Sequence, residues 1–531
     1  MTGENFAVLQ NAQAIPLSAI PVVAEQEFRN RVLSEVENGA RLSAFFGSPQ
    51  PCEDSAGPSQ GSSAAKRVRL YCVLARDSAR GLAVLATDVG DTYEALTPDC
   101  AQAHWFEREI AEQWGVRPEG HPWLKPIRFH ASYRRRNPER AGDSALHHDA
   151  WGRSADAEIL PGVTDYYRIE GEEVHEVAVG PVHAGVIEPG HFRFQCHGEN
   201  VYHLEISLGY QHRGVERALI GGPDRRTVHF METLAGDTTI GHAVAYAQNV
   251  ESLAGISVPL RAAVLRVVAL EMERLANHVG DMGALANDVG YLPTASYCGR
   301  LRGDMLNITA LICGNRFGRG LVRPGSVEFD LRPTHVAELR QRLQAAYRDT
   351  KNAVELLWNT PSVLARFEET GVVTADLAEE LGLVGPAARA SGLQRDVRAD
   401  LPAGFYREVK MPTARMQTGD VYARAMVRWQ EIENSVGYVL DCLEVLPAGT
   451  VRAEMRELRP ESLAVSLVEG WRGEICHVAL TDARGRFAQY KVVDPSFHNW
   501  IGLAMSLRGQ QISDFPLCNK SFNLSYCGHD L

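Results

Sequence analysis

The stretch VVALEMERLANHVGDMGALANDVG, residues 267–290, has the clearest periodicity in this 531-residue chain. Apolar side chains recur there in alternating steps of three and four, as on one face of an α-helix, and they are Leu265, Val268, Met272, Leu275, Val279 and Met282. A second stripe with helical spacing is polar and comprises Glu271, Arg274, His278 and Asp281. The sequence predicts a long helix with one buried apolar face. A polar stripe of this kind is usually a solvated or ion-paired face.

Helical patterns extend outward from this stretch. They dominate from about residue 225 to 360 and return in 375–395 and 416–444. A β-rich piece follows at 463–494, with a short helix expected after Trp500. Short β runs with Gly/Pro turns precede the helices. Residues 166–531 are therefore expected to form a mainly α-helical domain with small β subdomains.

The N-terminal third has a different character. A Gly/Ser/Pro-rich linker, GSPQPCEDSAGPSQGSSAAK, closes residues 1–65, which we interpret as an extension and linker. Two β-rich runs then lead into TPDCAQAHWFEREIAEQWGV (97–116), which has helical spacing. We expect an α/β domain over residues 66–165, a boundary near residue 165, and an α+β fold for the whole chain.

Composition excludes several classes of protein. The formal net charge of −12 gives no electrostatic reason to bind nucleic acid or anionic lipid. No run of about 18 apolar residues occurs, so we expect no transmembrane segment. The ten dispersed cysteines contain no C-x-x-C pair, which argues against a zinc ribbon or an Fe–S cluster held by this chain alone. Such dispersed cysteines are typical of reduced, mostly buried thiols in a cytoplasmic protein.

Familiar catalytic signatures are missing, since there is no G-x-S-x-G elbow, P-loop or H-E-x-x-H. Glycine-rich pieces lack the context of a dinucleotide site. One metal possibility stays open, because histidines and glutamates gather at His183, His191, His197, His203, Glu188, Glu199 and Glu205. Their spacing matches no fixed ligand pattern.

Several strings, in order, carry a resemblance to a known family. They are VGPVHAGVIEPGHFRF (179–194), GYQHRGVERAL (209–219), the 267–290 stretch and VEGWRGEICHV (468–478). Together they resemble the large subunit of group 4 membrane-bound NiFe hydrogenases, the formate hydrogenlyase type, whose close relative is the 49 kDa subunit of complex I. EREIAEQWGVRPEGHPWLKPIR (107–128) resembles the 30 kDa complex I subunit, fused in front in this branch.

The resemblance also shows a departure. Working relatives hold nickel and iron through two C-x-x-C pairs, whose positions fall here at Ala235 and Thr238 and at Ser496 and Asn499. All four thiolates are replaced, so we expect no metal from this set and no NiFe hydrogenase activity. The tail is expected to escape the maturation cleavage that accompanies metal insertion in relatives.

Complex I uses the corresponding cavity for quinone. Its quinone-binding His and Tyr fall here near Pro189 and at Gly236, so neither is plainly present. Other polar groups that the resemblance places in the former NiFe or quinone cavity are Asp237, Thr238, His242, Ser496, His498 and Asn499. QHRG (211–214) resembles the segment beside a partner's [4Fe-4S] cluster, which implies a cofactor-side role for His212 and Arg213.

The resemblance implies a peripheral-arm subunit of an oxidoreductase complex of the NADH:quinone type. It would sit on the cytoplasmic face of the cell membrane, bound to an Fe–S small subunit and to antiporter-like membrane subunits. Electrons would pass from the partner cluster to a quinone or another acceptor, and the helix stripe at 271–281 would line a charged route toward the membrane arm. The alternatives are a non-redox structural adaptor with a vestigial cavity, and a metalloenzyme with ligands from His183, His191, His242 or His498.

Overall fold

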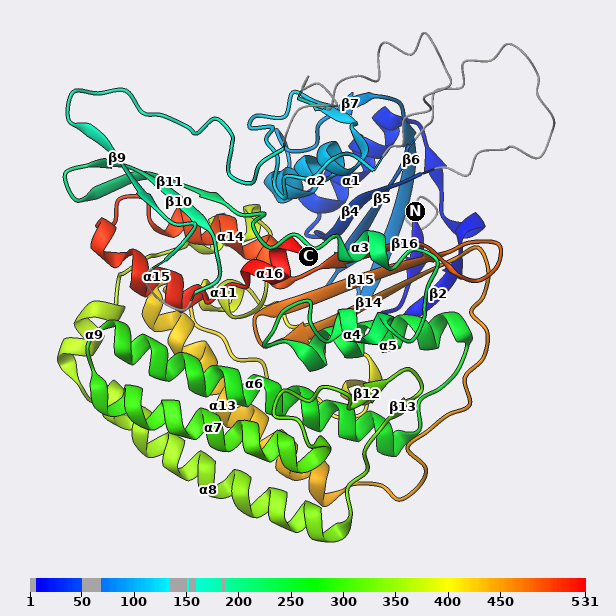
Figure 1. The fold of residues 1–531 in the computed structure, drawn as a ribbon, viewed down its shortest axis with the longest axis vertical. Helices are drawn as coiled ribbons and strands as arrows, with labels where there is room; N and C mark the ends of the chain where they lie inside the picture. The colour runs from blue at the N-terminus through cyan, green and yellow to red at the C-terminus, as the bar shows by residue number, and fades with distance from the viewer. Residues whose placement is uncertain (1–5, 50–67, 134–149, 152–158, 184–186) are drawn as a thin grey trace.

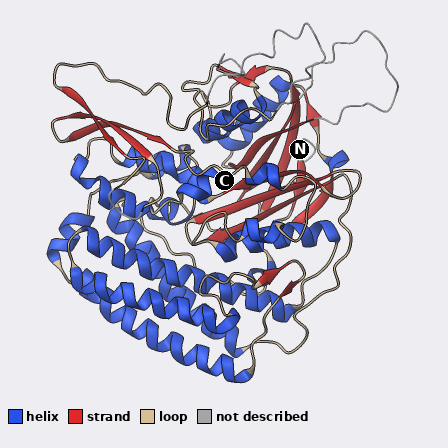
Figure 2. Ribbon diagram, viewed as in Figure 1, coloured by secondary structure: helices blue, strands red, loops and turns tan. Residues whose placement is uncertain are grey.

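A computed structural model describes residues 6–49, 68–133, 150–151, 159–183 and 187–531 (Figure 1). The architecture is α+β, as expected: a strand-rich N-terminal part lies on a largely helical remainder (Figure 2). Among the described residues, no helix combines the length and the apolar character needed to cross a bilayer.

The N-terminal sheet is built from strands on both sides of the linker. Its order is β1-β6-β5-β4, with β3 parallel to β6, and its strands are β1 (Ala7–Leu9), β3 (Val22–Val23), β4 (Arg41–Pro49), β5 (Val68–Arg76) and β6 (Gly81–Val89). Residues 1–65 are thus not merely an extension and linker, because β4 pairs along its length with β5. Helices α1 (Glu25–Glu37) and α2 (His104–Trp114) accompany the sheet, with the small pair β7 (Thr92–Glu94) and β8 (Arg117–Glu119).

A second sheet joins the two ends of the chain. Its order is β16-β15-β14-β2, from β2 (Gln13–Pro16), β14 (Ser462–Gly470), β15 (Gly473–Thr481) and β16 (Phe487–Val493). Pro16 pairs with Ser462, so an N-terminal strand completes a C-terminal sheet. Helix α5 (Thr239–Ala254) packs on β14 and β15. The domain limits expected at residues 65 and 165 therefore do not separate independent sheets.

Long helices form the other side of the molecule (Figure 1), and they are α6 (Leu260–Asp288), α7 (Leu292–Cys313), α8 (Pro333–Trp358) and α13 (Val421–Glu444). The predicted apolar stripe of α6 is buried, and it packs in the largest hydrophobic core. The polar stripe is buried as well, with 0% exposure at Glu271, Arg274 and His278. It is therefore not a solvated face.

Shorter elements complete the fold. One antiparallel sheet contains β9 (Val174–Val179), β10 (His191–His197) and β11 (Asn200–Ser207), and a hairpin contains β12 (Val322–Arg323) and β13 (Ser326–Val327). The short helices are α3 (Val215–Ala218), α4 (Thr227–Met231), α9 (Pro361–Phe367), α10 (Ala375–Glu380), α11 (Gly385–Ala390), α12 (Val397–Asp400), α14 (Pro495–Ser506), α15 (Phe515–Phe522) and α16 (Tyr526–Asp530).

Candidate functional site

The segment VVDPSFHNW forms the end of β16 and the start of α14. Asp494 caps the helix, with its Oδ1 accepting a 2.8 Å hydrogen bond from the backbone N–H of Ser496, and Pro495 occupies the first helical position. The helix thus begins before Trp500, and not after it as expected. Ser496, His498 and Asn499 lie on its first two turns and are buried.

The two strings that hold metal in relatives meet in space. His242 on α5 contacts Asp494 before α14, with Nε2 of His242 3.1 Å from Oδ2 of Asp494. Both residues are fully buried, with exposures of 0% and 1%. The carboxylate receives further support from the N–H of Ser496. Burial alone would raise the pKa of Asp494, but the hydrogen bond and charge of His242 outweigh it and lower that pKa.

His242 is also one link in a chain of buried polar groups. Its Nδ1 lies 3.0 Å from Nε2 of His477 on β15, and Nδ1 of His477 lies 2.9 Å from the hydroxyl of Tyr490 on β16. Burial lowers the pKa of His477 well below its usual value, so this imidazole is neutral. With His242 neutral, Tyr490 donates to His477, His477 donates to His242, and His242 donates to Asp494.

The four former ligand positions have structural roles here. Oγ of Ser496 accepts from the N–H of Ser525 at 2.8 Å. The amide of Asn499 accepts from the N–H of Val384 at 3.0 Å and donates to its carbonyl at 3.1 Å. Thr238 donates to Asp237 and accepts from Nε1 of Trp471, while Ala235 is wholly buried. These contacts use the polar groups of three positions within the protein.

Asp237 is the partly exposed member of the site. Arg472 binds its carboxylate with both terminal nitrogens, at 2.6 and 2.8 Å. Desolvation would raise the pKa of Asp237, but the charge and hydrogen bonds of Arg472 lower it overall. The Arg472 guanidinium also lies over the Trp471 ring, 3.9 Å from its centroid. The pair holds a fixed negative and positive charge at the start of α5.

His498 belongs to a different environment from His242. Its ring contacts Phe106 of α2, with centroids 5.6 Å apart, and its Nε2 has no hydrogen-bond partner among the described residues. Burial lowers the pKa of His498 to about 4. It is a neutral side chain at the contact with the N-terminal sheet unit.

The QHRG loop is held by the C-terminal segment. Nδ1 of His212 lies 2.7 Å from the Asp530 carbonyl, and the N–H of Arg213 donates to the Leu531 oxygen at 2.9 Å. The Arg213 guanidinium donates to the carbonyls of Thr233, Leu234 and Cys527. Burial lowers the pKa of His212 to about 4, so Arg213 carries the positive charge of this loop.

The histidines of the metal hypothesis are not brought together. His183 contacts the Gly190 carbonyl and His191 contacts the Gly180 carbonyl, whereas His197 pairs with Glu173. His242 lies in the relay with His477. Within the part of the chain that the structure describes, no group of three or more His, Cys, Asp or Glu side chains could hold a metal ion. This arrangement contradicts the hypothesis of a metal bound by His183, His191, His242 and His498.

Comparison with known proteins agrees with this geometry. Residues 288–463 match the respiratory-chain NADH dehydrogenase 49 kDa subunit, and residues 52–142 match the 30 kDa subunit. The carbon monoxide-induced hydrogenase of Rhodospirillum rubrum is 32% identical over 353 residues, covering 66% of this chain and 97% of that protein. The chain belongs to the family of group 4 hydrogenase large subunits and complex I 49 kDa subunits.

Other relatives of this large subunit come from both branches. Formate hydrogenlyase subunit 5 of Escherichia coli is 29% identical over 435 residues, covering 82% of this chain and 76% of the relative. A component of the NADH-quinone oxidoreductase of Dehalococcoides mccartyi is 30% identical over 341 residues, covering 63% and 92%. The chain is therefore a fused 30 kDa/49 kDa-type subunit of a hydrogenase- or NADH-quinone oxidoreductase-type complex.

The polar stripe of α6 lies in a buried charge network that the sequence did not predict. At its centre, Glu431 of α13 accepts 2.7 Å hydrogen bonds from Arg389, Arg398 and His278. Burial would raise the pKa of Glu431, but the surrounding arginines lower it well below its usual value. Glu271, Arg274, Asp396 and Glu469 complete the network. Only the stripe's own residues had a signal in the sequence, because the partners come from distant elements.

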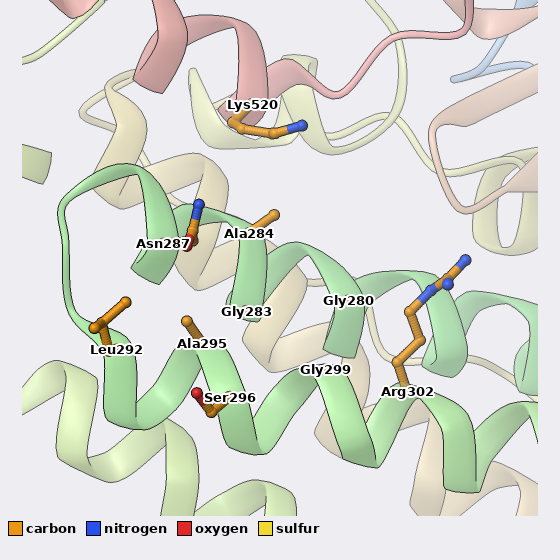
Figure 3. Close-up of a pocket in the computed structure, with 10 residues that line it drawn as sticks. All are labelled: Gly280, Gly283, Ala284, Asn287, Leu292, Ala295, Ser296, Gly299, Arg302 and Lys520. Carbon is orange, nitrogen blue, oxygen red and sulfur yellow. The ribbon is translucent and has the colours of Figure 1, made fainter. Parts of the chain in front are cut away.

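A cleft of about 450 Å³ opens beside this large subunit's site, between α6 and α7 and under Lys520 of α15 (Figure 3). Small side chains line its floor, and Arg302 and Lys520 project at its edges. Gly280 on its wall lies one helical turn beyond Asn277, whose amide donates to the Asp237 carbonyl at 2.9 Å. The cleft is thus adjacent to the Asp237–Arg472 pair.

Proposed function

We propose that this large subunit transfers electrons from a [4Fe-4S] cluster on a small partner subunit to a quinone or another organic acceptor. It does so without activating hydrogen at a NiFe centre. The observation that carries the proposal is the state of the four ligand positions. Ala235 has no donor atom, and Thr238, Ser496 and Asn499 bind other protein groups in place of a metal. Neutral hydroxyl and amide oxygens are poor substitutes for bridging thiolates.

Two features support an acceptor near Asp237. The cleft between α6 and α7 lies beside the Asp237–Arg472 pair, and that pair offers both a hydrogen-bond acceptor and fixed donors at the site. Reduction of a quinone takes two electrons and two protons, so polar groups must accompany the acceptor. Asp237, Thr238 and Arg472 are the partly exposed and buried groups we assign to this role, while His242 positions Asp494.

The assembly follows from the family. We place an Fe–S small subunit against Arg213, and antiporter-like membrane subunits beneath the complex on the cytoplasmic face of the cell membrane. Arg213 is suited to tune the potential of a nearby cluster, because its charge is held rigidly by three carbonyls.

A non-redox structural adaptor is the second candidate. The observation that favours it is the internal satisfaction of the former ligand positions, where Ser496 and Asn499 bind backbone groups. In this case the retained shape couples membrane subunits mechanically, and no electron passes through the chain.

The test is purification of the native complex through a tag on this chain, followed by metal analysis, electron paramagnetic resonance and quinone reduction. We expect a reducible [4Fe-4S] signal that is reoxidised by added ubiquinone-1, no stoichiometric nickel, and no hydrogen uptake with methyl viologen. Asp237→Asn should slow reoxidation at least tenfold, whereas exposed Asp376→Asn on α10 should not. A complex without any cluster would establish the adaptor, and stoichiometric nickel would refute the central claim.

A further inference from the structure

A positively charged surface lies next to the QHRG loop. This basic surface comprises six side chains from three segments, all exposed to solvent: Arg217, Arg225, Arg226, His229, Arg316 and Arg319. In Figure 1, α3, α4 and the β12–β13 hairpin follow one another down the same side of the view. The chain as a whole carries a formal charge of −12, so this concentration of cations runs against its average.

Buried Glu232 joins the segments into one surface. Its carboxylate accepts from the N–H of Gly320 at 2.7 Å and from Nη1 of Arg323 at 3.0 Å. His229 on α4 lies 3.7 Å from the same carboxylate. The loop carrying Arg316 and Arg319 is thus tied to the end of α4. The next two residues along the chain, Thr233 and Leu234, accept from the Arg213 guanidinium.

Little negative charge opposes these cations. Asp224 neutralises Arg226, with their charged groups 2.9 Å apart. Among the described residues, Arg225, Arg316 and Arg319 form no ion pair, and Arg316 instead lies 4.9 Å from the centroid of the Phe317 ring. Arg217 lies over Tyr133 in the same way. An exposed arginine without a carboxylate partner is available to an anionic group of another molecule.

We infer that the basic surface docks an acidic face of the cluster-carrying partner subunit. This inference rests on the proposed function, because it takes the partner to be the protein whose cluster lies against Arg213. A [4Fe-4S] cluster with four thiolate ligands is itself an anion, and carboxylates around it would complement this surface. Complementary charge of this kind steers association and fixes the orientation of the two proteins. The acidic chain as a whole disfavours nucleic acid as the occupant.

Charge reversal at the surface tests the inference in the intact complex. Wild type, R316E/R319E and the control R342E/R348E on α8, where both arginines are exposed, are purified through the same tag. Iron per tagged chain and the cluster signal measure the bound partner. We expect R316E/R319E to retain at least tenfold less cluster than the control when salt rises from about 0.05 M to about 0.5 M. Unchanged melting temperatures verify that both variants fold.

Each outcome decides something. Loss of cluster in R316E/R319E alone supports the docking surface. Equal retention in all three proteins overturns it while leaving the proposed electron transfer intact. A wild-type complex without a cluster overturns both. If R316E/R319E keeps the cluster but loses binding to vesicles of phosphatidylglycerol, the surface binds anionic lipid, and the inference is wrong.

Discussion

Nε2 of His242 lies 3.1 Å from the carboxylate of Asp494, and this buried contact joins the two segments that hold metal in related hydrogenases. Replacing His242 by Ala would leave Asp494 without its imidazole and His477 without its acceptor. We expect a loss of about 3 kcal/mol of unfolding free energy. Denaturant unfolding measures it, with exposed His175→Ala as the control expected to stay within about 0.5 kcal/mol. A similar result for both variants would show that the contact has no structural weight.

Glu431 gathers four cationic or imidazole groups around one buried carboxylate. Glu431→Gln removes the negative charge and leaves three buried arginines under-compensated, so we expect a loss of about 3–5 kcal/mol in unfolding free energy. Glu433→Gln on the same helix is the matched control, because Glu433 is exposed. Thermal unfolding of the pair checks the prediction. Equal melting temperatures would contradict it.

Asn499 clamps the backbone of Val384 with both ends of its amide. Asn499→Cys restores a family ligand but removes both hydrogen bonds. We expect a loss of about 2 kcal/mol and no gain of nickel, because the other three ligand positions stay without thiolates. Melting temperature and metal analysis after growth with nickel test the two halves separately. Stoichiometric nickel in this variant would refute the interpretation of the site.

Glu273 gives the stability a defined pH dependence. Its carboxyl accepts from the N–H groups of Ile240 and Gly241, and burial raises its pKa from 4.5 to about 8. A raised carboxyl pKa stabilises the fold most below about pH 4.5 and loses that contribution as pH rises toward about 8. Glu273→Gln cannot ionise and should therefore lose less stability than wild type between these limits. Parallel pH profiles of melting temperature for the two proteins would exclude this effect.

The helices were predictable because their signal is local. The apolar stripe from Leu265 to Met282 already determines the buried face of α6, and it lies in the core as expected. The fate of the polar stripe was not predictable, because His278 acquires its meaning only from Glu431, far along the chain. The same limit applies to residues 7–49, whose strands need β5, β6 and β14 as partners.

For the candidate site, the sequence indicated which positions meet but not what they do there. His242 and Asp494 come together as the order of the family strings implies. His498 instead contacts Phe106, and Arg472 supplies the partner of Asp237. Motif spacing contains no information about such contacts, since they depend on how β15, α2 and α14 pack.

The pairing of β2 with β14 has a consequence for biosynthesis. A ribosome releases Gln13–Pro16 among the first residues and Ser462–Val465 only near the end of translation. During that interval the early strand has no native neighbour on this side, so the sheet closes only when nearly the whole polypeptide has emerged. Truncated translation products consequently expose an unpaired edge, which makes them natural substrates for chaperones and proteases.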